Sequence, residues 1–206
     1  MEVKRDAVVG FNLNIGQKVS QNQVAGKAAV DLIDVYPITS FMSLNLPFRI
    51  SVLLFIHDEQ DRLLMIERRK APNQGCWSPV GGKLEMAEGE SPFECAIREA
   101  HEETAMELTE SDLHLFGMVS EKSYEGTGHW LMFLFDVKKP LTRVPATIDE
   151  GRMAFFTRQE VESLKTPRTD RQLLWPYYDS HRGQFVAMRA NCLPESELEI
   201  VIEESH

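Results

Sequence analysis

Three glutamates, Glu99, Glu102 and Glu103, stand close together in a segment predicted to be helical. At about 100° per helical residue, they fall within one arc of about 100° on the helix surface. Like charges at this spacing repel one another, and bound cations would remove that cost. Hard carboxylate oxygens favour Mg²⁺ or Mn²⁺ over zinc. The alternative interpretation is a solvated helix face in an acidic protein.

The helix that carries these glutamates is predicted over residues 91–104. Ser91 fits the N-cap position, Pro92 the first helical position, and Glu94 completes a capping box. The apolar residues of the helix form a neighbouring stripe that should bury against a sheet: Phe93, Ala96, Ile97, Ala100 and Thr104.

Strand patterns surround this helix. The runs ISVLLFI and RLLMIERR, separated by HDEQD, predict a hairpin, and HLFGMVSE and HWLMFLFDV predict two further strands around a glycine-containing loop. RMAFF predicts a short strand, and a capping box at 157–160 predicts a second helix. A helical stretch around DRQLLW should stop or kink at Pro176, and QFVAMRA and ELEIVIEE should pair as a terminal hairpin.

Length and composition limit the broad class. The 206 residues suit one domain with an appendage, so we divide the chain into an N-terminal extension of one or two strands (1–47) and a domain with C-terminal helix and strand additions (48–206). Lys and Arg number 22 against 32 Asp and Glu, and the net charge of −10 disfavours nucleic-acid polymers as partners. The cysteines show no zinc spacing, and no signal or membrane-spanning run stands out. We therefore expect a soluble, cytoplasmic protein without membrane association.

The segment GGKLEMAEGESPFECAIREAHEETAM resembles the Nudix box, G-x5-E-x7-R-E-U-x-E-E-x-G-U, in which U is aliphatic. Gly82 opens the box, Glu90 takes its first glutamate position, and Arg98 and Glu99 follow in register. There are two departures. Seven residues rather than five separate Gly82 from Glu90, and Ala105 stands where the family has glycine, so we expect a different helix end there. The resemblance covers roughly residues 49–165.

Membership of the Nudix hydrolase superfamily would imply an α/β (α+β) fold, an α/β/α sandwich with a mixed β-sheet. It would also imply attack by water on a diphosphate in a small, nucleotide-linked substrate. Glu99, Glu102, Glu103 and the carbonyl of Gly82 would hold Mg²⁺ or Mn²⁺, with Glu102 and Glu103 central to catalysis. Arg98 would orient the glutamates, because a guanidinium fork matches carboxylates.

Candidates outside the box are weaker. Glu150 precedes a predicted strand, where similar enzymes often supply an acidic ligand or general base, and the alternative is a turn carboxylate. Arg69 belongs to a basic run, 68–70, that could contact phosphate or lie in solvent. Tyr124 lies in a loop where dinucleoside-polyphosphate hydrolases of this family tend to have tyrosine.

Three functions compete. The leading one is a Mg²⁺-dependent pyrophosphohydrolase acting on a nucleoside diphosphate derivative or a nucleoside triphosphate. A nucleotide-sensing Nudix domain without catalysis is the second, although such domains usually lose glutamates that are present here. A Nudix-like prenyl-diphosphate isomerase is the third, and Cys76 is its only support. A strand added at a sheet edge by residues 1–47 would suit a homodimer.

Overall fold

The computed structural model describes residues 46–206, so most of the predicted N-terminal extension lies outside the described residues. The strands are β1 (Phe48–Phe55), β2 (Leu63–Arg68), β3 (Trp77–Pro79), β4 (Leu113–Tyr124), β5 (Gly128–Val137), β6 (Gly151–Phe156), β7 (Val186–Asn191) and β8 (Glu199–Ser205). The helices are α1 (Pro92–Thr104), α2 (Arg158–Ser163) and α3 (Trp175–His181), with a 3-10 turn at Glu110–Asp112 and a π-helical turn at Asp170–Leu174.

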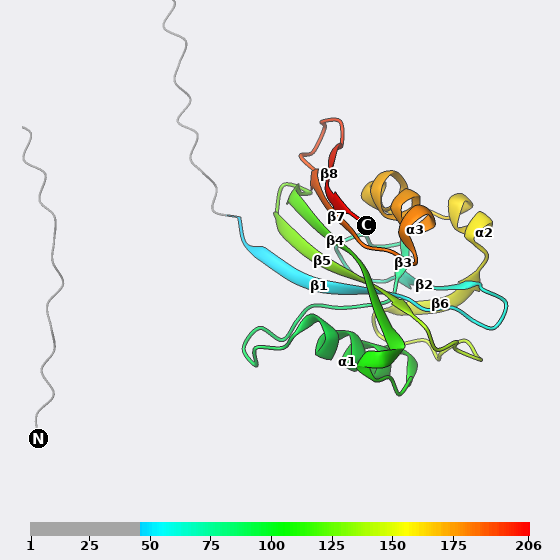
Figure 1. Cartoon of the computed structure of the whole chain (residues 1–206). Coiled ribbons are helices and arrows are strands. Elements are labelled where there is room, and N and C mark those ends of the chain that lie inside the picture. The colour runs from blue at the N-terminus through cyan, green and yellow to red at the C-terminus, as the bar shows by residue number, and fades with distance from the viewer. Residues whose placement is uncertain (1–45) are drawn as a thin grey trace, which may run out of the picture. The chain divides into compact units, whose positions relative to one another are not determined.

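These strands form two sheets (Figure 1). The larger sheet has the order β1-β5-β4-β7-β8 and is mixed, with β1 parallel to β5 and β4 parallel to β7. The smaller sheet, β3-β2-β6, is antiparallel. The predicted pairings of β4 with β5 and of β7 with β8 are confirmed.

The predicted hairpin between β1 and β2 is wrong. The polar turn does form, because Asp58 N–H donates to the carbonyl of Arg62 at 3.0 Å, but the two strands then enter different sheets. The free edge of β1 is occupied by the segment after β3. Val52 N–H donates to Gly82 O and Leu54 N–H donates to Val80 O, both at 2.9 Å. This pairing brings Gly81 and Gly82 against β1.

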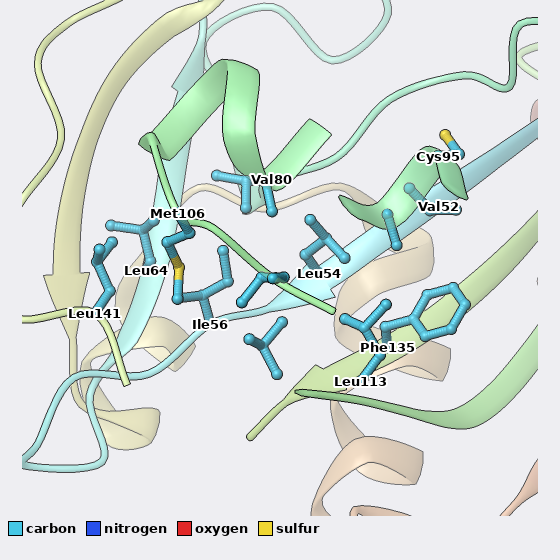
Figure 2. Packing of buried hydrophobic residues seen from close by; sticks show 14 of the residues in the cluster. Val52, Leu54, Ile56, Leu64, Val80, Cys95, Met106, Leu113, Phe135 and Leu141 are labelled. Carbon is cyan, nitrogen blue, oxygen red and sulfur yellow. The ribbon is translucent and has the colours of Figure 1, made fainter. Parts of the chain in front are cut away.

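Helices cover both faces of the larger sheet, which makes the predicted α/β/α sandwich (Figure 1). The even-numbered residues of β1, Val52 and Leu54, pack with Cys95 and other buried residues of α1, as Figure 2 shows. The odd-numbered residue Phe55 packs on the opposite face against Trp175. Burial of the second half of β1 on both faces explains the unbroken apolar run over residues 52–56.

Both predicted capping boxes are present, and α1 begins as expected with Ser91 accepting a bond from Glu94 N–H. The expectation of a different C-terminal cap at Ala105 is wrong. Ala105 keeps the left-handed conformation (φ 58°, ψ 25°) that glycine favours, and its N–H bonds back to His101 O at 2.8 Å. Pro176 does not stop the predicted helical stretch, because the π-helical turn Asp170–Leu174 continues directly into α3. The break in regular α-helical geometry falls just before Pro176, in line with the kink that was the other expectation.

The described region 46–206 contains no helix that is long and apolar enough to cross a membrane.

Candidate active site

A cavity of about 800 Å³ opens where α1, the glycine segment and the larger sheet meet, a size typical of small-molecule sites. Side chains of β1, β4 and β5 form its floor, and loops around residues 71–73, 148–150 and 167–170 form its rim. Of the predicted site residues, the cavity brings together Gly82, Glu99, Glu102, Glu103, Tyr124 and Glu150.

Two glycines fit closely between β1 and α1. Gly81 has φ +143°, and a Cβ there would overlap the carbonyl oxygen of Val52. A Cβ on Gly82 would overlap the carboxylate of Glu99. The glycines therefore allow a backbone strand and a helix carboxylate to approach within contact distance.

Glu99 and Glu103 lie one helical turn apart at this end of the cavity, and both are largely buried. Gly81 N–H donates to Glu103 Oε2 at 3.1 Å. Burial, followed by the charge of Glu99, raises the pKa of Glu103 to about 8. Burial also raises the pKa of Glu99, although the neighbouring Arg98 opposes that shift. Two buried carboxyl groups whose desolvation is only partly offset by hydrogen bonds and ion pairs are typical of a site that is completed by a bound cation.

Arg98 forms ion pairs with three glutamates of this segment and donates to one backbone carbonyl. Its guanidinium bonds Glu90 at 2.7 and 3.0 Å, Glu99 at 2.8 Å, Glu102 at 3.1 Å and the carbonyl of Lys83 at 3.1 Å. These ion pairs raise the pKa of Arg98 above its usual range. Arg98 is not part of the cavity lining.

The donors at this end fit a hard divalent cation. They are oxygens only, two of the carboxyls are desolvated, and the Glu99 carboxylate lies directly against the backbone of Gly82. Glu102 differs from Glu99 and Glu103, because its carboxylate is half exposed and forms an ion pair with Arg98 at 3.1 Å. Within residues 46–206, no three carboxylate, imidazole or thiol groups already converge around one point.

The remaining predicted residues divide into two groups. Glu150 lies exposed on the rim, 3.6 Å from Lys70 Nζ, and Tyr124 Oη donates to Asn73 Oδ1 at 2.6 Å in the cavity wall. Arg69 lies outside the lining, with Nη1 3.4 Å from the carbonyl of Ile148, and the neighbouring Arg68 lines the cavity instead.

Several lining residues were not predicted from the sequence. Lys83 and Arg49 lie over the ring of Trp130, at 5.8 and 5.5 Å from its centre, and Lys83 and Trp130 line the cavity. Glu121 and Asp170 also line it, far from the box in sequence. The signal for Glu121 was its position two residues after Val119, on a strand face that is otherwise buried.

Cys76 does not line the cavity, so the observation on which the isomerase interpretation depended lies outside the site.

Comparisons with known proteins agree with this geometry. The family model of the NUDIX domain matches residues 47–176. A MutT protein from Bacillus halodurans is similar at 24% identity and TM-score 0.60, over 75% of this chain and 97% of its own. A MutT protein from Methanosarcina mazei is similar at 20% identity and TM-score 0.55, over 66% and 94%. The NUDIX domain of Shewanella oneidensis NrtR, solved with ADP ribose, is similar at 16% identity and TM-score 0.52, over 66% and 87%. At these identities the structures share a fold.

Proposed function

The chain belongs to the Nudix family of hydrolases, which act on pyrophosphate bonds, and from that premise we propose that it is a Mg²⁺- or Mn²⁺-dependent pyrophosphohydrolase. Its substrate is a nucleoside diphosphate derivative or a nucleoside triphosphate. The observation that supports this most is the placement of Gly82 and the buried Glu99 and Glu103 on one wall of a nucleotide-sized cavity.

In this proposal the carboxylates of Glu99, Glu102 and Glu103 and the carbonyl of Gly82 hold the divalent ion. Gly82 O already accepts a bond from Val52 N–H at 2.9 Å and a weak one from the Cys95 thiol at 4.0 Å, which the divalent ion would replace. An ion held there would neutralise charge on the phosphate oxygens and make the attacking water more acidic. Arg98 keeps the carboxylates in register, and substitution of such supporting groups typically weakens metal sites.

The reaction joins a water oxygen to one phosphorus while the bond from that phosphorus to the bridging oxygen breaks. The leaving phosphate keeps the electron pair, and a carboxylate accepts the proton of the water. Glu150, which lies on the accessible rim and outside the proposed set of metal ligands, is the candidate for this role. Arg68 and Lys83 add positive charge to the same cavity.

The test is a substrate panel of nucleoside triphosphates, ADP-ribose, NADH, nucleotide sugars and dinucleoside polyphosphates, each with Mg²⁺, Mn²⁺ or EDTA. We expect hydrolysis of at least one compound only with metal, and ¹⁸O from labelled water in one product phosphate. Glu88→Gln is a matched control, because Glu88 is exposed and lies outside the cavity. Full activity in excess EDTA would contradict the metal, and nucleotide binding without any product would favour the sensing function.

A further inference from the structure

The walls of the cavity carry more negative than positive charge. Among residues 46–206, two cationic side chains line it, Arg68 and Lys83, against five glutamates and two aspartates. These acids lie at the α1 end and also at the end away from α1, the β4 end, where Glu121 comes from β4 and Asp170 from the π-helical turn. A phosphate chain is repelled wherever it faces these carboxylates without a cation. The placement of the two cations therefore matters for binding a pyrophosphate.

Arg68 is the last residue of β2, and one side of its guanidinium is held in place. Its Nε donates to the carbonyl of Pro72 at 3.0 Å, while its two Nη groups form no hydrogen bond or ion pair with any residue in 46–206. Burial raises the pKa of Glu103 and of Asp170 to about 8, and the charge of Arg68 opposes both shifts. The guanidinium thus lies within reach of both ends of the cavity, with its Nη groups available for phosphate oxygens.

The Pro72 carbonyl belongs to the loop 69–76 between β2 and β3, which forms part of the cavity rim. Pro72 and Asn73, at the tip of this loop, both line the cavity. The tip is tied to the larger sheet by one side-chain bond among the described residues, in which Tyr124 Oη donates to Asn73 Oδ1 at 2.6 Å. The hydroxyl of Tyr124 therefore sets where the tip lies, and with it the carbonyl that holds Arg68.

The backbone of β4 is irregular where it presents Tyr124. Glu121 lines the cavity, and a regular strand would place residue 123 next on that face. Instead, the pairing with β5 shifts between Glu121 and Tyr124, and Ser123 and Glu125 have φ of 58° and 49°. Residues other than glycine seldom adopt such values, and they gather at functional sites. The bulge thus brings Tyr124 into the cavity wall, where it reaches Asn73.

We infer that Tyr124 is a positioning residue, which fixes the loop through Asn73 and so holds the Arg68 guanidinium where it meets the substrate phosphates. The chain of contacts is short, because Asn73 directly follows Pro72, whose carbonyl accepts the bond from Arg68 Nε. Tyr124 thus acts through its hydroxyl and not through contact of its ring with the substrate. This inference rests on the proposed function for the phosphate chain that Arg68 meets.

The first test removes the hydroxyl alone and measures phosphate binding without hydrolysis. Calorimetry with Mg²⁺ gives the Kd of imidodiphosphate, a non-hydrolysable pyrophosphate analogue that has no base. Tyr124→Phe should weaken binding by about three- to tenfold, and Arg68→Met by about tenfold or more. In the Arg68→Met background, Tyr124→Phe should change Kd by less than about 1.5-fold, because its effect passes through Arg68. Tyr177→Phe is the matched control, since Tyr177 lies outside the cavity and its hydroxyl has no bond within residues 46–206.

Two further measurements separate positioning from a general loss of stability. Amide hydrogen exchange over residues 71–76 should be faster in Tyr124→Phe, while exchange in α1 stays unchanged. For a substrate from the panel, KM should rise about threefold or more and kcat change by about twofold or less, as expected when ground-state binding is lost. Asn73→Gly keeps the positive φ accessible, so it should reproduce both effects and add nothing to Tyr124→Phe.

The outcomes separate the two proposals. Equal effects of Tyr124→Phe with and without Arg68, or an unchanged Kd and unchanged exchange in the loop, would overturn the positioning role and leave the pyrophosphohydrolase intact. Absence of imidodiphosphate binding to wild type would overturn it as well. A loss of binding in Tyr124→Phe that disappears in the Arg68→Met background, without hydrolysis of any substrate, would overturn the proposed reaction and support the positioning role. If Tyr124→Phe does not fold in a thermal melt, Asn73→Gly with and without Arg68→Met decides by the same comparison.

Discussion

The two acidic ends of the cavity are built differently. At the α1 end, Glu99 and Glu103 come from adjacent turns of one helix, and Arg98 anchors the cluster through several bonds. At the β4 end, Glu121 and Asp170 come from distant segments and have no such anchor within residues 46–206. The arginine fork fixes Glu99, whereas burial raises the pKa of Glu103 at this end as it does those of Glu121 and Asp170 at the other. The two ends therefore differ in what holds their carboxyls in place rather than in whether a carboxyl keeps its proton.

The largest expected effect belongs to Glu103→Gln. Loss of a metal ligand should lower the hydrolysis rate by about 100-fold or more, since such an interaction acts in the transition state. Wild type should gain about 2.7 kcal/mol of stability when Mg²⁺ is at one hundred times its Kd, and the variant should lose most of that gain. Glu121→Gln should keep the Mg²⁺-dependent gain, which distinguishes the two ends. The measurements are rates and thermal melts with and without Mg²⁺.

Equal Mg²⁺-dependent shifts and near-equal rates for wild type and Glu103→Gln would show that the α1 glutamates do not hold a catalytic metal ion.

The pH dependence of metal-free stability should be the next largest effect. The pKa of Glu103 rises from 4.5 to about 8 on folding. The folded state therefore binds more protons between these values, so stability falls as pH rises from 4.5 to 8, by about 1 to 3 kcal/mol. In EDTA, Glu103→Gln should be more stable than wild type at about pH 8 and similar to it below about pH 4.5. Urea unfolding at several pH values measures this, and parallel curves would show that Glu103 keeps an ordinary pKa.

Arg98→Lys should lower kcat about tenfold and raise the Mg²⁺ concentration needed for half-maximal rate. Lysine keeps the charge but cannot bond Glu90, Glu99 and Glu102 in one fixed arrangement. Arg158→Lys is the matched control, because Arg158 makes a two-pronged pair with Asp179 away from the cavity. A variant with lower stability but an unchanged Mg²⁺ dependence would leave Arg98 a purely structural role.

The two ends of the cavity also differ in how far their residues could be predicted from the sequence. The α1 end lies within one short segment, so capping signals, helical spacing and the box pattern are enough to identify Glu99, Glu102, Glu103 and Arg98 from the sequence alone. The β4 end requires knowing that β4 and the loop before α3 meet, and no local pattern carries that information. The pairing of strands has the same limit, because strands that are distant in the sequence pair without any local pattern to indicate it.

One error in the predicted elements has that origin. The β4–β5 hairpin was predictable, because its turn joins strands that pair directly. The β1–β2 hairpin was not correct, because residues 80–84 occupy the edge of β1. Arg69 was selected from a basic run in which only strand geometry shows that Arg68 lines the cavity.

Ala105→Gly should sharpen the view that the α1 end depends on its carboxylates and not on every position of the box. Ala105 is exposed and holds φ 58°, which glycine adopts without steric cost, so the substitution should stabilise the protein by about 0.5 to 1 kcal/mol. The hydrolysis rate should not change. Ala146→Gly, at an exposed loop position without positive φ, should give no gain. A loss of stability in Ala105→Gly would contradict the strained cap.

The smallest effect is expected from deleting Met86 and Ala87, which restores the usual spacing between Gly82 and Glu90. Both residues are exposed, Met86 by 65%, and they lie in a turn closed by Glu88 N–H donating to Glu85 O at 3.0 Å. Shortening such a turn changes loop-closure entropy little, so unfolding free energy should shift by about 0.5 kcal/mol or less and kcat/KM by about twofold or less.

The matched control for this deletion removes Lys83 and Leu84 instead. Leu84 packs against the core, and its N–H donates to Ile50 O at 3.1 Å along the edge of β1. Removing these residues should cost about 2 kcal/mol or more and displace Gly82 from Glu99, so activity should fall with stability. Urea unfolding and rate measurements on both deletions compare them directly. If the Met86–Ala87 deletion also lost its cooperative transition, the insertion would be part of the structure that holds the α1 end in place, and the box spacing would matter as much as its carboxylates.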